Sequence, residues 1–145
     1  TGWRIGYAGG PKDVIKGIVD VSSQSTTSPD TIAQWAMVEA LNNVDESGRF
    51  IAMAREAYRR RRDLIVKGLN DLGLPTPKVN GAFYVLSDVS KIDPDENRAA
   101  LRMLEEAKVA VVPGTDFAAP HHVRFSYATS EENIRQALER IGSIR

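Results

Sequence analysis

Two arginines in this sequence have neighbours that would suit an anion-binding role. Arg4 lies in the glycine-rich segment Thr1–Gly6, and Arg124 lies between two apolar residues in Val123–Phe125. A guanidinium presents a planar fork of N–H donors that binds a phosphate or a carboxylate through two parallel hydrogen bonds, and lysine cannot reproduce this geometry. From spacing alone, either arginine could instead be a solvated surface charge, as most arginines are.

Other motifs that could form a catalytic, metal or phosphate site give weaker signals. His121 and His122 are adjacent, so their side chains point apart on any regular element, and no further metal ligands occur at a suitable spacing. This pattern favours a loop role and disfavours a metal site or a Ser–His–Asp site. The segment Gly114–Phe117 lacks the Gly-Lys-Ser/Thr of a phosphate-binding P-loop and predicts a tight turn.

The bulk composition is that of a globular domain. The chain has 145 residues, of which 42% are hydrophobic and 26% are charged; this length is enough for a real core. Its 19 basic and 19 acidic side chains cancel, so no net field favours nucleic acid or an anionic membrane. The basic run Arg59–Arg62 could contact nucleic acid, but without interleaved aromatics it is more typical of a solvated helix face. The lack of cysteine excludes a disulfide framework and fits a reducing compartment.

The first third of the chain predicts a strand and two helices. Residues 3–8 are typical of a short strand, and Pro11 suits the first turn of the helix that follows. Ser28 as N-cap and Pro29 as first helical residue predict a second helix, which stops near Asn42.

The rest of the chain predicts a smaller α+β arrangement. Strict alternation places Val123, Phe125 and Tyr127 on one face of a strand, with Arg124 and Ser126 on the other. The expected elements are a long helix at about Ser47–Leu72, a strand at Ala82–Leu86, a helix at Pro94–Lys108, strands at Val109–Val112 and Val123–Tyr127, and a last helix capped by Thr129 or Ser130.

The character of the sequence changes near Val44, which indicates a domain boundary there. We expect residues 1–43 to be the end of one domain. Residues 44–145 then form a whole smaller domain, in which a three-stranded sheet packs with helices.

The order of several motifs resembles one family, the class I aminotransferases of fold type I, which use pyridoxal 5'-phosphate (PLP). The resemblance covers essentially all 145 residues and points to the C-terminal part of such an enzyme. It is most similar to the bacterial-type aspartate aminotransferase branch, to which Ser25–Pro29 and Ser126–Glu132 contribute. The three main segments are Thr1–Gly6, Asn80–Tyr84, and Val111–Thr115 leading to Val123–Ser130.

The resemblance implies both a fold and a function. The fold would be the α/β PLP-dependent transferase fold, with residues 1–43 ending the large PLP-binding domain and residues 44–145 forming the small C-terminal domain. The implied function is amino transfer between an L-amino acid, aspartate, and a 2-oxo acid. Arg4 would hold the coenzyme phosphate and Arg124 the substrate α-carboxylate. The family implies a cytoplasmic homodimer with no metal, nucleic-acid partner or membrane partner.

The sequence departs from the family pattern at two places. The Schiff-base lysine would lie a few residues before Thr1, and none of the six lysines present occupies that place. We therefore expect no catalytic residue in this chain and no activity from the 145 residues alone. The second departure is Ala118–His122, where relatives usually carry glycine and where the loop before Arg124 could alter substrate fit.

Two alternatives stay open at this point. Arg4 and Arg124 would also suit another fold-type I PLP enzyme, such as a β-lyase or a decarboxylase. A non-catalytic module that associates with itself is the other alternative, since an apolar face left uncovered favours association.

Overall fold

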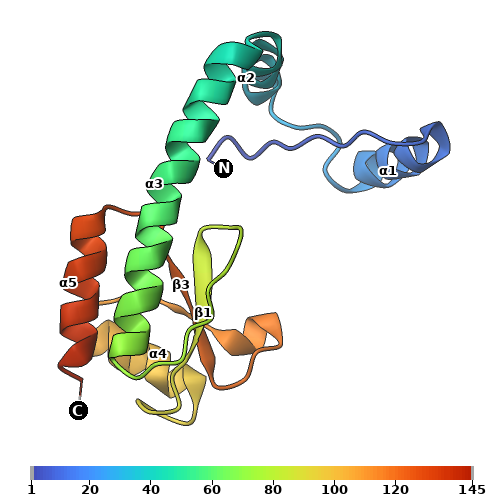
Figure 1. Cartoon of the computed structure of the whole chain (residues 1–145). Coiled ribbons are helices and arrows are strands. Elements are labelled where there is room, and N and C mark those ends of the chain that lie inside the picture. Colours follow the sequence, from blue (N-terminus) through green and yellow to red (C-terminus); the bar gives the residue numbers. More distant parts are fainter. Residues whose placement is uncertain (1, 145) are drawn as a thin grey trace. The chain divides into compact units, whose positions relative to one another are not determined.

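The computed structural model describes residues 2–144 and divides the chain into two compact units, Thr1–Ala52 and Met53–Arg145 (Figure 1). Helix α3 (Val44–Asp71) begins in the first unit and ends in the second. It ends before Gly73, whose φ of 75° is the left-handed conformation expected of a helix-terminating glycine. The domain boundary expected near Val44 stays a prediction.

The first unit contains helices and connecting segments. Helix α1 (Lys12–Ser25) begins directly after Pro11, as predicted. The prediction of a strand at residues 3–8 is wrong: these residues form no strand, and the described part of this unit contains no strand with which they could pair. Helix α1 continues into the hydroxyl-rich residues after Val21 and ends at Ser25, whose hydroxyl donates to helix carbonyls.

Helix α2 (Thr31–Asn42) begins two residues later than expected. Its N-cap is Asp30, whose carboxylate accepts a hydrogen bond from the Ala33 amide at 2.8 Å. The prediction of Ser28 as the cap was therefore wrong. Asp and Ser cap helices about equally well, so composition alone does not decide between such close candidates. The predicted end near Asn42 is confirmed.

The second unit holds the expected three-stranded sheet. Strands β1 (Tyr84–Asp88), β2 (Val112–Pro113) and β3 (His122–Ser126) pair antiparallel in the order β1-β3-β2. Strand β1 begins two residues later than predicted. Strand β2 is much shorter than Val109–Val112, because the chain at Val109 is still closing the preceding helix: its amide donates to the Met103 carbonyl.

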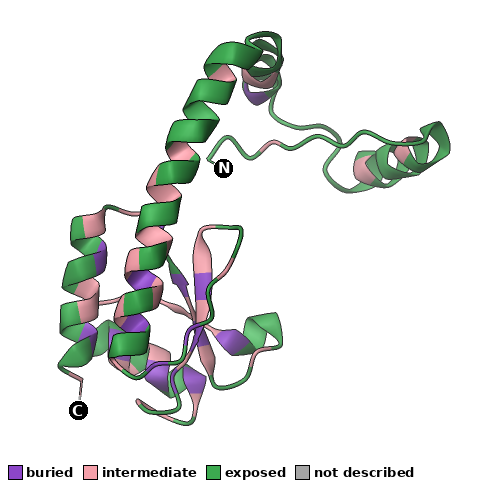
Figure 2. Cartoon of the chain, viewed as in Figure 1, coloured by how far each residue is buried: buried purple, intermediate pink, exposed green. Residues whose placement is uncertain are grey.

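One face of this sheet packs against three helices, and this packing forms the core (Figure 2). The helices are α3, α4 (Glu96–Glu105) and α5 (Glu131–Gly142). Ser130 caps α5 by accepting from the Asn133 amide, so the Thr129 alternative is wrong. The core residues are Ile65 and Leu69 of α3, Ala99 and Met103 of α4, Ile134 and Ile141 of α5, and Val85, Val123, Phe125 and Tyr127 in or beside the sheet.

The alternation predicted for the last strand is confirmed, with Val123, Phe125 and Tyr127 all buried. Arg124 must therefore project from the face opposite the helices. In the described part of the chain, no helix is both long and apolar enough to cross a membrane.

Candidate functional site

Arg124 occupies the middle of the small sheet. Strand β3 is the central strand, and in its register Arg124 lies opposite Leu86 of β1 and Val112 of β2. Because both neighbours in sequence point into the core, the backbone of Arg124 is held by the sheet and by the packing beneath it. A charge placed this way has little freedom to move, which suits a binding group that must present a fixed orientation.

Two aromatic rings hold the guanidinium of Arg124. Its Cζ atom lies 4.7 Å from the ring centroid of Tyr84 and 4.3 Å from that of Phe117. Both distances are within the range of cation–π attraction. Among residues 2–144, the side chain of Arg124 forms no hydrogen bond or ion pair, so its N–H groups are available to an external anion.

The surroundings of Arg124 form an apolar hollow of about 470 Å³. An anion bound there would lie against hydrocarbon walls, where a charge–charge attraction is stronger than in water. A single guanidinium surrounded by apolar walls would suit a small organic molecule whose carboxylate binds Arg124 and whose apolar part contacts the walls. The residues that line the hollow are Pro77, Val79, Tyr84, Val85, Leu86, Phe117 and Arg124.

Phe117 reaches this hollow from the turn predicted between β2 and β3. The segment Gly114–Phe117 is a single turn of 3-10 helix, η1. Ala118 follows it with a left-handed φ of 52°, and the Ala119 amide closes the turn by donating to the Gly114 carbonyl at 3.0 Å. The prediction of a tight turn is therefore confirmed.

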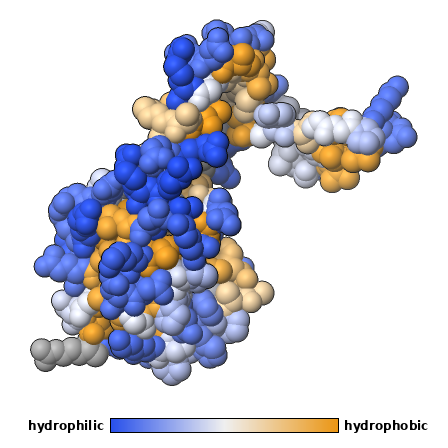
Figure 3. All heavy atoms as spheres, viewed as in Figure 1, coloured by the Kyte–Doolittle hydropathy of each residue, from blue (hydrophilic) through white to orange (hydrophobic). Residues whose placement is uncertain are grey.

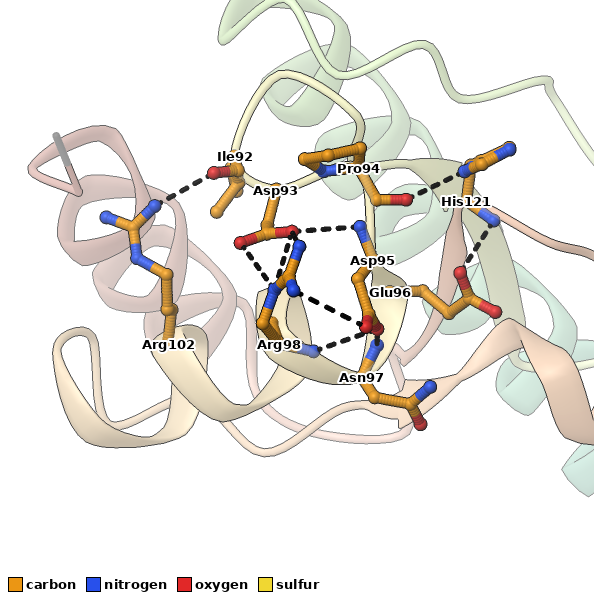
Figure 4. Close-up of polar contacts among 9 residues, drawn as sticks. All are labelled: Ile92, Asp93, Pro94, Asp95, Glu96, Asn97, Arg98, Arg102 and His121. Carbon is orange, nitrogen blue, oxygen red and sulfur yellow. Dashed lines mark hydrogen bonds and ion pairs between the residues drawn. The ribbon is translucent and has the colours of Figure 1, made fainter.

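A buried carboxylate, that of Glu96, ties this loop to helix α4 (Figure 4). One carboxylate oxygen accepts from the Thr115 hydroxyl, and the other accepts from the His121 amide at 3.0 Å. These hydrogen bonds, above all that from Thr115, lower the pKa of Glu96 to about 2. The two partners lie 19 and 25 residues away. Sequence reasoning missed Glu96, since an acid in the first turn of a helix is also common for dipole reasons.

This pKa predicts how stability depends on pH. The carboxyl of Glu96 binds its proton more weakly when folded than when unfolded, so its contribution is complete above about pH 4.5 and is lost as pH falls toward 2. The free energy of unfolding should fall between pH 6 and pH 3 in the wild type, and we expect it to fall less in Glu96→Gln, as measured by urea denaturation. Glu106→Gln is the control, and its free energy of unfolding should fall over this pH range by nearly as much as that of the wild type. Equal pH dependence in wild type and Glu96→Gln would contradict this assignment.

His121 is the last residue of the same loop, and His122 is the first residue of β3. Nδ1 of His121 donates to the Pro94 carbonyl at 2.8 Å (Figure 4), and Nδ1 of His122 donates to the Pro120 carbonyl at 2.7 Å. Both rings bond to backbone carbonyls; the predicted loop position is confirmed for His121 and is wrong for His122, which pairs within the sheet. No cluster of potential metal ligands occurs among the described residues.

Arg4 belongs to the first unit and Arg124 to the second, so the structure describes the two predicted anchors separately. Arg4 is exposed and has a left-handed φ of 53°. No hydrogen bond or ion pair of Arg4 is found within residues 2–144, and apart from each glycine and its two chain neighbours no atom lies within 4 Å of where a Cβ would stand at Gly2 or Gly6. Its five donors and the open space beside it fit a phosphate group.

The basic run on α3 is used largely within the protein. Arg59 and Arg60 pair with Glu56, and Arg60 also pairs with Glu131. Arg61 lies 5.6 Å from the ring centroid of Tyr58. These contacts favour the interpretation of a helix face over that of a nucleic-acid site.

A comparison with protein families shows to which family this chain belongs. The model of the family "Aminotransferase class I and II" matches residues 1–141. The chain belongs to this family. This aminotransferase chain therefore has the expected α/β architecture, and the resemblance seen in its motifs is confirmed.

Individual relatives agree with the family assignment. The chain is 69% identical over 144 residues to the aspartate/prephenate aminotransferase of Thermus thermophilus, covering 99% of the chain and 37% of the relative. It is 44% identical to an aspartate aminotransferase of Rhizobium meliloti, with 99% and 37% covered. The chain thus spans only a little over a third of the length of these relatives.

Solved structures show the same similarity. The aspartate aminotransferase from Thermus thermophilus with maleate has a TM-score of 0.89 at 68% identity, over 99% of this chain and 37% of that one. The aromatic aminotransferase from Pyrococcus horikoshii has a TM-score of 0.85 at 39% identity, over 98% and 38%.

Proposed function

We propose that the full-length protein containing this chain transfers an amino group between an L-amino acid, aspartate, and a 2-oxo acid. The observation that supports this most is Arg124, a guanidinium held by two rings in an apolar hollow with no acid bonded to it. Arg124 binds the substrate α-carboxylate in this proposal. The relatives, an aspartate/prephenate aminotransferase and an aspartate aminotransferase, support the reaction and the donor.

We propose PLP as the coenzyme, with Arg4 binding its phosphate. When bound, PLP supplies an electron sink for the carbanion formed at the substrate α-carbon. The residues of this chain supply binding and orientation. Arg124 fixes the carboxylate, and with it the direction of the Cα–H bond, while the rings of Tyr84 and Phe117 lie against the guanidinium.

A coupled assay of the full-length protein distinguishes this reaction from those of other PLP enzymes. With aspartate and 2-oxoglutarate, we expect oxaloacetate and glutamate in equal amounts, and no more than one equivalent of oxaloacetate per active site when the 2-oxo acid is omitted. Ammonia or carbon dioxide release without a 2-oxo acid would instead favour a β-lyase or a decarboxylase and would contradict the proposal.

The role of Arg4 predicts a coenzyme defect. In the full-length protein, Arg4→Ala removes two charge-assisted hydrogen bonds to phosphate and should raise the Kd for PLP by about 10- to 100-fold, measured by absorbance titration. At saturating PLP, kcat should change much less. The control Arg49→Ala removes another exposed arginine of the first unit and should leave the Kd unchanged. An unaltered titration with Arg4→Ala would rule out the role.

We also propose that the protein is a cytoplasmic homodimer. Helices α1 and α2 expose large apolar side chains, several of them more than half exposed, including Val14, Val21, Ile32 and Trp35 (Figure 3). Such a surface favours burial against another protein surface. The same exposure supports the second candidate, in which the 145-residue chain by itself is a self-associating module. Sedimentation of the chain tests that candidate, and a clean monomer would count against it.

A further inference from the structure

Phe117 contacts Arg124 from a loop and not from a strand. Strand β2 ends at Pro113 and β3 begins at His122, so the ring lies in the connection between them. The residue remains 40% exposed, which means that packing alone does not fix its ring. The position of the ring therefore depends on what holds the loop.

Glu96 holds this loop at two points, one on each side of Phe117. Thr115, which bonds one carboxylate oxygen, comes two residues before the ring, and His121, which bonds the other, comes four residues after it. Glu96 is itself only 9% exposed and lies in the first turn of α4, whose Ala99 and Met103 are fully buried in the core. The carboxylate thus connects the loop to a rigid element.

The second of these points is under conformational strain. His121 has a left-handed φ of 64°, a region that residues other than glycine seldom adopt. Such a conformation persists only where the surrounding contacts determine it. Here they are the bond to Glu96, the bond from its ring to the Pro94 carbonyl, and a hydrogen bond that its own carbonyl accepts from the Val89 amide at 2.9 Å.

We infer that Glu96 is a positioning residue for substrate binding: it fixes the loop of residues 114–121 and so holds Phe117 against the guanidinium of Arg124. The inference rests on the proposed role of Arg124 as the carboxylate anchor. Glu96 touches no substrate in this account. Its effect passes through Phe117, and this makes the effect measurable as a coupling between two residues.

The test is a double-mutant cycle in the PLP-loaded full-length protein, with maleate as the probe and calorimetry as the readout. We expect Glu96→Ala to raise the Kd for maleate about five- to thirtyfold. In a Phe117→Ala background the same change should raise it less than twofold, because the ring that Glu96 positions is gone. A purely structural role would give the same factor in both backgrounds, and that result would overturn the inference.

Further variants distinguish the effects on maleate binding of the Glu96 charge, of its hydrogen bonds and of misfolding. Glu96→Gln can still accept from the His121 amide and donate to the Thr115 hydroxyl, so its Kd should stay within threefold of wild type. Thr115→Val removes only the hydroxyl contact to Glu96 and should weaken maleate binding severalfold. It is the variant to use in place of Glu96→Ala if Glu96→Ala does not fold. Glu106→Ala, at the other end of α4, is the matched control and should change nothing. Unchanged maleate binding in folded Glu96→Ala or in Thr115→Val would also overturn the inference.

Arg124→Lys distinguishes a failure of this inference from a failure of the proposed function. If Arg124→Lys binds maleate as tightly as wild type, the proposed anchor is wrong. If Arg124→Lys loses binding but Glu96→Ala does not, the anchor stands and only the role of Glu96 is wrong.

Discussion

Arg124→Ala in the full-length protein should lower kcat/KM for aspartate by about a hundredfold to ten-thousandfold, while its affinity for PLP stays close to wild type. Two hydrogen bonds between charged groups contribute roughly 1.5–3 kcal/mol each, and the α-carboxylate would lose both. The coenzyme phosphate is assigned to Arg4, in the other unit, so PLP titration should be nearly unaffected.

Arg124→Lys is the sharper variant, because it keeps the positive charge. Lysine cannot form the planar fork or stack its charge in the same way on Tyr84 and Phe117. We expect a loss of about thirty- to a hundredfold in kcat/KM, corresponding to one charged hydrogen bond of roughly 2–3 kcal/mol. Arg140→Lys, an exposed arginine of α5, is the matched control and should stay within twofold of wild type.

An equal loss of PLP affinity and of kcat/KM in Arg124→Ala would contradict the assignment, since the residue would then act on the coenzyme or on the whole fold. Full activity of Arg124→Lys would contradict it in another way, because a point charge would be sufficient. Thermal unfolding of each variant checks that the sheet remains intact.

Gly114→Ala should be the most damaging change of a glycine in the second unit. A Cβ at this position would lie 2.6 Å from the His122 carbonyl oxygen and still closer to that of Ala119, and both obstacles are backbone. Backbone cannot move aside as a flexible side chain does, so we expect destabilisation of about 2–3 kcal/mol. Urea denaturation of the 145-residue chain, followed by circular dichroism, measures the change.

Gly48→Ala is the matched control for Gly114→Ala. Gly48 lies on α3, and beyond its chain neighbours and the backbone of its own helix no atom lies within 4 Å of its Cβ position, so alanine there should stabilise the helix by roughly 0.5–1 kcal/mol. The two substitutions add the same methyl group and should have opposite signs. An unchanged unfolding midpoint for Gly114→Ala would mean that the loop before β3 is much looser than the structure shows.

Periodicity in the sequence was sufficient to predict the helices and the central strand. The alternation of Val123, Phe125 and Tyr127 identifies the buried face of β3 and places Arg124 on the opposite face from the sequence alone. These predictions depend on neighbours two to four residues apart, and for that reason a single sequence contains them.

Features that depend on distant partners could not be predicted in this way. The strand expected at residues 3–8 has suitable composition but no pairing partner among the described residues of its unit. The bonds of Glu96 to Thr115 and His121 join α4 to a loop about twenty residues later. The contact of Phe117 with Arg124 likewise needs the folded turn at Gly114. Local patterns contain no signal for such contacts.

The most direct test of the central claim is a crystal structure of the full-length protein with PLP and maleate. We expect one maleate carboxylate to accept two hydrogen bonds from the guanidinium of Arg124, with the rings of Tyr84 and Phe117 still against it. A structure in which maleate binds elsewhere and Arg124 contacts only solvent would contradict the account.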